Sequence, residues 1–245
     1  MLKLLNTCSS SQGHIHGDDF GRILADYKYS GIIDFIPDTD NVAIIDPLVT
    51  KGLKNPLTHR KLKQFVRDDF DLGRFHLNDG DRVSILLPNG AEAAVTLICV
   101  LKKWCAAPIS PTSTLHEITS EMLSAKSKCL IIQKGSPLNQ IAIQAAESID
   151  VGIIEIESDE TTSGLFTMKL LRPTNDTKIG KLTVSKSCRQ SFGHPENVLL
   201  IHTSGTSGNK KLVPYTLDTV MIGVGCIISS WCLTETDVCL NMVGF

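Results

Sequence analysis

Residues 82–109 read RVSILLPNGAEAAVTLICVLKKWCAAPI and contain, in one stretch, both kinds of element from which the fold is expected to be built. Residues 82–87 form a short apolar run that ends at Pro-Asn-Gly (88–90), which indicates a strand followed by a turn. Residues 91–103 are rich in alanine and leucine and apolar on most faces, so they predict a buried helix. Residues 106–109 then predict a second strand.

The same alternation continues towards the C-terminus. Thr114 and Glu117 have the spacing of a capping box, so a helix is expected to begin there and to run to about Lys126. The next expected elements are a strand at 129–132, a helix that opens at Ser136-Pro137, and a strand at 151–156. The proline favours a helix start because the first helical position has no hydrogen bond to lose. Strands that alternate with helices imply right-handed crossovers, so the predicted fold class is α/β, with a mainly parallel sheet flanked by helices on both faces.

The remaining segments are expected to be less regular or to lie outside this core. Residues 1–19 are expected to be a flexible N-terminus, because 6–19 are polar and small. Residues 157–197 mix Ser, Thr, Gly, Pro and charge, and we interpret them as an irregular excursion with a short hairpin near 165–171. Further on, we expect a strand at 198–201, a very apolar helix at about 216–231, and a strand at 237–242.

Composition excludes several classes of protein. The chain has 245 residues, of which 42% are hydrophobic, and its net charge is -2 from 24 basic and 26 acidic residues. This balance gives no electrostatic reason to bind nucleic acid or an anionic membrane, and no apolar run is long enough to span one. The N-terminus does not resemble a secretory signal, and the eight cysteines form no Cys-x-x-Cys pair. We therefore expect buried free thiols in a cytoplasmic protein that is not secreted.

The most informative motif follows the strand expected at 198–201. Residues 202–211 read HTSGTSGNKK, with two glycines, four hydroxyl residues and two lysines. Glycines let backbone amides approach an anion, hydroxyls donate further hydrogen bonds, and a lysine supplies positive charge, so the composition suits a phosphate. The segment is not a Walker A loop, because no Ser or Thr follows the lysines, and it contains no Gly-x-Gly-x-x-Gly. The alternative is a Ser/Thr/Gly-rich surface loop without a ligand.

The string resembles the phosphate-loop signature of the adenylate-forming synthetase family, roughly Tyr-Thr-Ser-Gly-Thr-Thr-Gly-x-Pro-Lys-Gly-Val. The matching residues are Thr203, Ser204, Gly205, Thr206, Gly208, Lys211 and Val213, and Ser207 conservatively replaces Thr. His202 stands where an aromatic residue is usual. Lys210 and Leu212 stand where Pro and Gly are usual, which predicts a less rigid loop.

Four other segments carry the same resemblance in the expected order. They are PLTHRKL at 56–62, DGDRV at 79–83, LPNGAE at 87–92 and APISP at 107–111. Together with the loop they span about residues 40–243. The resemblance implies that residues 20–245 are a partial AMP-binding (adenylation) N-terminal domain, which is incomplete because the family's later motifs and its C-terminal domain with a catalytic lysine are missing.

The resemblance also implies an activity: ATP-dependent adenylation of a carboxylic acid, followed by thioester formation, most similar to acyl-CoA synthetases. The implied cofactors are ATP and Mg²⁺, and the implied substrates are a small carboxylic acid and, as co-substrate, coenzyme A. The implied nucleotide-binding residues are Thr203, Ser204, Gly205, Thr206, Ser207, Gly208 and Lys211. No catalytic residue or metal ligand is assigned. The alternative is a truncated, non-catalytic chain that at most binds nucleotide or a partner, and the apolar helix at 216–231 is expected to favour association.

Overall fold

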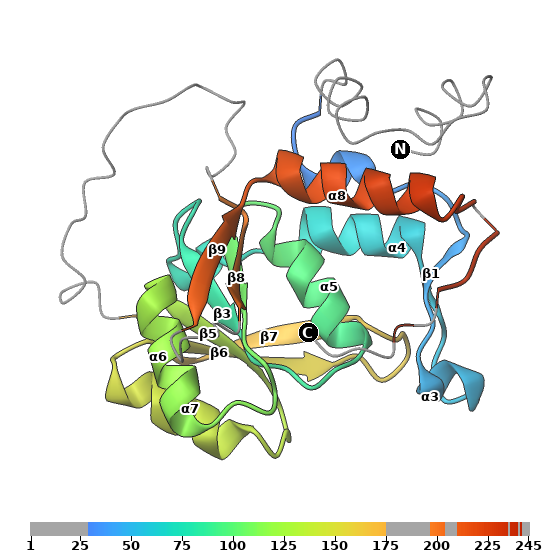
Figure 1. Cartoon of the computed structure of the whole chain (residues 1–245). Coiled ribbons are helices and arrows are strands. Elements are labelled where there is room, and N and C mark those ends of the chain that lie inside the picture. Colours follow the sequence, from blue (N-terminus) through green and yellow to red (C-terminus); the bar gives the residue numbers. More distant parts are fainter. Residues whose placement is uncertain (1–28, 175–196, 204–209, 235, 240, 242–245) are drawn as a thin grey trace.

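A seven-stranded, mostly parallel sheet organises the part of the chain that the computed structural model describes, namely residues 29–174, 197–203, 210–234, 236–239 and 241 (Figure 1). The strand order is β7-β6-β5-β3-β4-β8-β9. The strands are β3 (Arg82–Ile85), β4 (Cys105–Pro108), β5 (Cys129–Gln133), β6 (Gly152–Ser158), β7 (Phe166–Arg172), β8 (Leu199–Thr203) and β9 (Lys211–Tyr215). The five inner strands are parallel, and β7 and β9 pair antiparallel at the two edges.

Helices cover both faces of the sheet, as the α/β prediction requires. One face carries α6 (Leu115–Ala125) and α7 (Asn139–Ser148), and the other carries α5 (Ala91–Val100) with α4 (His59–Gln64) and α8 (Leu217–Ser230) beyond it. Side chains of a strand point alternately to the two faces, so Leu130 and Ile132 pack beneath α6 and α7 while Ile131 packs on the α5 side. The predicted fold class is therefore confirmed.

The N-terminal part of the described chain adds small elements beside α4. They are a two-stranded sheet of β1 (Val42–Ile44) and β2 (Leu57–Thr58), the short helix α3 (Pro47–Thr50), the 3₁₀ turns η1 (Ile32–Phe35) and η3 (Gly73–Phe75), and the π-helical turn η2 (Phe65–Asp69). Phe70 lies between Trp104 and Phe166, with ring centroids 5.9 Å and 6.2 Å away in edge-on geometry. These aromatic contacts attach the N-terminal part to the sheet.

Most of the expected central elements are confirmed within one or two residues. The capping box of α6 is complete: the Thr114 amide donates to Glu117 Oε2 at 2.8 Å, and the Glu117 amide donates to Thr114 Oγ1 at 3.3 Å. The helix ends where Lys126 adopts a left-handed conformation, with φ of 54°. The helix expected to open at Ser136-Pro137 is present but begins slightly later, at Asn139, because residues 137–138 form a turn before α7.

Two edge elements differ from the expectation. Residues 166–172, expected to lie in an irregular excursion, form the seven-residue strand β7, which pairs antiparallel with β6. Residues 175–196 of the expected excursion lie outside the described part. The strand expected at 237–242 is wrong for its described residues. The Asp237 carboxylate accepts hydrogen bonds from the Thr234 amide at 2.6 Å and hydroxyl at 2.9 Å, so the chain turns there instead. The expected flexible segment 1–19 lies outside the described residues.

The cysteine expectation holds in the core and fails near the end of α8. Cys99, Cys105 and Cys129 are buried free thiols, and burial raises the pKa of Cys105 to about 11 and that of Cys129 to about 12. Cys232 and Cys239 are free but exposed. Within the described ranges, no helix is both long enough and apolar enough to cross a membrane.

Candidate functional site

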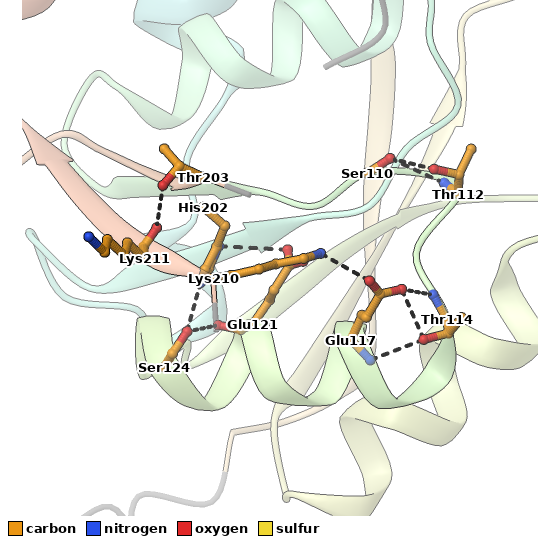
Figure 2. Close-up of polar contacts among 10 residues, drawn as sticks. All are labelled: Ser110, Thr112, Thr114, Glu117, Glu121, Ser124, His202, Thr203, Lys210 and Lys211. Carbon is orange, nitrogen blue, oxygen red and sulfur yellow. Dashed lines mark hydrogen bonds and ion pairs between the residues drawn. The ribbon is translucent and has the colours of Figure 1, made fainter. Parts of the chain in front are cut away.

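The β8–β9 hairpin holds the two ends of the glycine-rich segment. Thr203 is the last residue of β8 and Lys211 the first of β9; they are paired in register, and Thr203 Oγ1 donates to the Lys211 carbonyl at 3.4 Å (Figure 2). These are the two described members of the predicted site. The other five predicted residues lie outside the described part of the chain: Ser204, Gly205, Thr206, Ser207 and Gly208.

The hairpin lies where ligands commonly bind in α/β folds. Strand β8 runs parallel to its neighbour β4, so Thr203 lies at the carboxyl edge of the parallel strands. Ligands of open α/β sheets bind outside this edge. The chain that leaves β4 passes Ser110 and Thr112, whose hydroxyls are 2.9 Å apart, and then enters α6 at Thr114. The N-terminus of α6 and the described ends of the glycine-rich segment therefore lie at the same edge of the sheet (Figure 2).

Lys210 is held by two acidic side chains of α6. Its Nζ lies 2.5 Å from Glu121 Oε1 and 3.3 Å from Glu117 Oε1. The hydrogen bond to Glu121 raises the pKa of Lys210, so the lysine stays charged. Hydrogen bonds from Thr114, and then Lys210, lower the pKa of Glu117 to about 2. The lysine that departs from the family signature is thus committed to an ion-pair network.

Lys211 differs from Lys210 in what surrounds it. Lys211 is exposed, and its side chain extends away from α6 (Figure 2). Among the described residues, its ammonium makes no ion pair, whereas that of Lys210 makes two. An exposed, uncommitted ammonium beside a glycine- and hydroxyl-rich segment is suited to an anionic ligand.

His202 precedes the segment on β8 and contacts the same helix. Its Nε2 is 2.7 Å from Ser124 Oγ, and its Nδ1 is 3.6 Å from Glu121 Oε2. Burial lowers the pKa of His202, and nearby Lys210 acts in the same direction, while Glu121 opposes both. The imidazole is therefore neutral near pH 7 and serves as a hydrogen-bonding group.

Sequence reasoning did not identify Glu121 and Ser124, and it assigned Glu117 only to helix capping. One signal was available for Glu121. It lies among Ile118, Met122 and Ala125, which form the buried face of α6. A carboxylate on a buried helical face requires a cationic or hydrogen-bonding partner. The sequence could not reveal which partner, because Lys210 is far away along the chain.

Comparisons with known proteins identify the family. The family model described as AMP-binding enzyme matches residues 72–245. The oxalate–CoA ligase of Arabidopsis thaliana is 27% identical over 188 residues, which cover 74% of this chain and 34% of that protein. The acyl-CoA synthetase FUM10 of Gibberella moniliformis is 24% identical over 205 residues, covering 81% of this chain and 37% of that protein. The chain thus spans about a third of the length of these relatives.

Solved structures with the same fold include two from Rhodopseudomonas palustris. A putative long-chain-fatty-acid CoA ligase superposes with a TM-score of 0.55 at 21% identity, covering 78% of this chain and 45% of that one. Apo MatB superposes with a TM-score of 0.55 at 16% identity, covering 83% and 37%. At these identities the likeness concerns the fold.

Proposed function

Because this chain belongs to the AMP-binding enzyme family, we propose that it supplies the phosphate-binding part of an ATP-dependent acid–CoA ligase. In this proposal residues 20–245 form a partial adenylation domain. The single observation that carries the proposal is the β8–β9 hairpin. It places the ends of the glycine-rich segment at the carboxyl edge of the sheet, with the exposed ammonium of Lys211 beside it.

The proposed reaction has two steps. A carboxylate oxygen attacks the α-phosphorus of ATP, which forms an acyl-adenylate and releases pyrophosphate. A thiol, such as that of coenzyme A, then attacks the acyl carbon and releases AMP. The protein's part in the first step is to orient the phosphates in line and to offset the charge that develops on them.

The proposed phosphate-binding groups come from one continuous segment. Hydroxyls and backbone amides would hold the β- and γ-phosphates, and an ammonium would offset their charge. The residues are Thr203, Ser204, Gly205, Thr206, Ser207 and Gly208, with Lys211 supplying the ammonium. The exposed oxygen of Thr203 also fits Mg²⁺, which prefers oxygen ligands and binds together with substrate phosphates. Mg²⁺ would help to neutralise the phosphate charge.

The proposal is tested by ATP titration of the chain with Mg²⁺ present, measured by calorimetry. Lys211→Ala and Gly205→Val are each expected to weaken ATP binding about tenfold or more, since a hydrogen bond to a charged group contributes about 1.5–3 kcal/mol. Lys169→Ala is the matched control, because Lys169 is an exposed lysine on β7 at the opposite edge of the sheet. Unchanged affinity in both site variants would contradict the assignment.

The alternative, a non-catalytic chain that binds nucleotide or a partner, is favoured by one observation. Helix α8 exposes apolar side chains on its surface, and Trp231 directly after it is 70% exposed. Contiguous exposed apolar surface commonly marks an interaction site. Pyrophosphate release with a panel of carboxylic acids separates the two functions: the ligase requires acid-dependent release, whereas the binding role requires ATP affinity or association without release.

A further inference from the structure

Both flanks of segment 204–209 are attached to one helix, α6. On the β8 side, His202 Nε2 lies 2.7 Å from Ser124 Oγ. On the β9 side, Lys210 Nζ lies 2.5 Å from Glu121 Oε1. Glu121 and Ser124 are three residues apart on the helix and therefore lie on the same face. Figure 2 shows the two contacts converging on this face from the hairpin.

Glu121 occupies the centre of this arrangement. Its side chain is only 5% exposed, and the His202 side chain is 6% exposed. One carboxylate oxygen contacts Lys210, and the other faces His202 Nδ1 at 3.6 Å. A buried carboxylate is costly unless it is compensated, so loss of a partner would destabilise the whole arrangement. The Lys210 flank is therefore ion-paired to Glu121, whereas the His202 flank is hydrogen-bonded to Ser124 and lies beside the same carboxylate.

The Ser124 hydroxyl links His202 to α6. Ser124 Oγ donates its one proton to the Glu121 backbone carbonyl at 3.0 Å, so in the 2.7 Å contact it accepts from the Nε2–H of a neutral His202. Within the described part of the chain, Nδ1 makes no hydrogen bond. The charged groups that face the imidazole are Glu121, which raises its pKa, and Lys210, which lowers it. Hydrogen bonding and ion pairing thus act together on the two strands.

We propose that Glu121 is a positioning residue that fixes both flanks of segment 204–209 on α6, and so determines where Thr203 and Lys211 are held. Lys210, which stands where the family signature usually has proline, provides by an ion pair the constraint that a proline ring would otherwise impose. The consequence for ligand binding rests on the proposed function, because the positions of Thr203 and Lys211 affect ligand affinity only if the segment binds nucleotide phosphates.

Amide hydrogen exchange without nucleotide tests the attachment itself. Lys210→Met removes the ion pair at a lysine whose side chain is 36% exposed, so the fold should be retained, and thermal melting verifies this. We expect about tenfold faster exchange in β8 and β9, and no change in β5. Lys134→Met is the matched control, because it breaks the exposed Lys134–Glu157 pair of 2.6 Å elsewhere on the sheet. Unchanged exchange in β8 and β9 would overturn the proposal.

ATP affinity tests the functional consequence. Glu121→Gln and Lys210→Met should each raise the Kd for ATP about tenfold, and the double variant should be no worse than the worse single variant, since the two side chains act as one unit. Lys210→Arg preserves the charge and should retain most of the affinity for ATP. A purely steric role of the lysine side chain would not require the charge to be kept.

The outcomes of the two measurements are distinguishable. Faster exchange with an unchanged Kd would overturn the role of Glu121 in nucleotide binding. Additive losses of ATP affinity in the Glu121→Gln/Lys210→Met double variant would overturn the claim that the two side chains act as one unit. If the parent chain binds no ATP, the proposed function fails, and the exchange result alone decides whether α6 fixes the hairpin.

Discussion

The centre of the sheet and its β8–β9 edge are held by different forces. In the centre, β5 lies between two parallel strands, and Leu130, Ile131 and Ile132 are fully buried between the helix layers. At the edge, β9 has one neighbouring strand, and both Lys211 and Pro214 are exposed. Apolar burial dominates in the centre, whereas at the edge a smaller apolar contact of Leu200 and Leu212 with Ala125 is supplemented by ion pairs and hydrogen bonds to α6.

This difference separates scaffold from site. Burial of apolar area is strong but non-directional, so it gives a stable sheet without specifying a ligand. Polar contacts are weaker and directional, so they suit the proposed phosphate-binding role, in which amides and an ammonium would be presented in a set geometry. Pro214 also fits an edge position, because a proline lacks the amide that a further strand would need.

The largest expected effect compares a leucine from each region. Leu130→Ala in β5 should lower the free energy of unfolding by about 2–5 kcal/mol, since it leaves a cavity in a fully buried site. Leu212→Ala in the partly buried β9 should cost about 1 kcal/mol or less. Urea denaturation measures both, and equal losses would show that the edge is packed as tightly as the centre.

A smaller effect is expected at the helix caps. Thr114→Ala removes the capping box of α6 and should cost about 1 kcal/mol. Thr216→Ala removes the simpler cap of α8, which is not a capping box, and should cost less; there the threonine hydroxyl accepts from the Thr219 amide at 3.2 Å and is hydrogen-bonded to the Thr219 hydroxyl at 3.0 Å. The comparison is made by thermal denaturation. A larger loss at Thr216 would show that the simpler cap of α8 stabilises the protein more than the capping box of α6 does.

The exposed apolar surface of α8 predicts association with little effect on stability. Val224 and Ile227 are 38% and 49% exposed, and lie on the same side of the helix as Trp231. Ile227→Lys should change the unfolding free energy by about 0.5 kcal/mol or less. It should also reduce concentration-dependent association in analytical ultracentrifugation. Thr219→Lys adds the same charge in the first turn of α8 and should leave association unchanged.

The smallest expected effect is a pH dependence specific to the site edge. The folded-state pKa of Glu117 is lowered from 4.5 to about 2, so its contribution to stability is present above pH 4.5 and is lost as the pH falls towards 2. Glu117→Gln should flatten this part of the melting temperature profile between pH 5 and pH 2. A parallel profile in the variant would show that the carboxylate contributes no acid sensitivity.

Local patterns predicted the central elements well. The strand, turn, helix and strand of residues 82–109 were recoverable because hydrophobic periodicity and Pro-Asn-Gly act over a few residues. The Thr114–Glu117 capping box was recoverable for the same reason. The errors occurred where local signals are weak. Pro137 suits a turn as well as a helix start, and the apolar residues after Asp237 suggested a strand although the aspartate closes a turn with Thr234.

The sequence by itself determined the α/β fold class and pointed to the glycine-rich segment, since periodicity, capping and a short motif are encoded by neighbouring residues. Only the tertiary structure decided that β9 returns beside β8, that Lys210 and Lys211 have different surroundings, and that Glu121 and Ser124 of α6 contact the two flanks. The physical reason is distance along the chain. Glu121 and Lys210 are brought together by crossovers and strand pairing, and a pattern read over a few residues carries no record of such a contact.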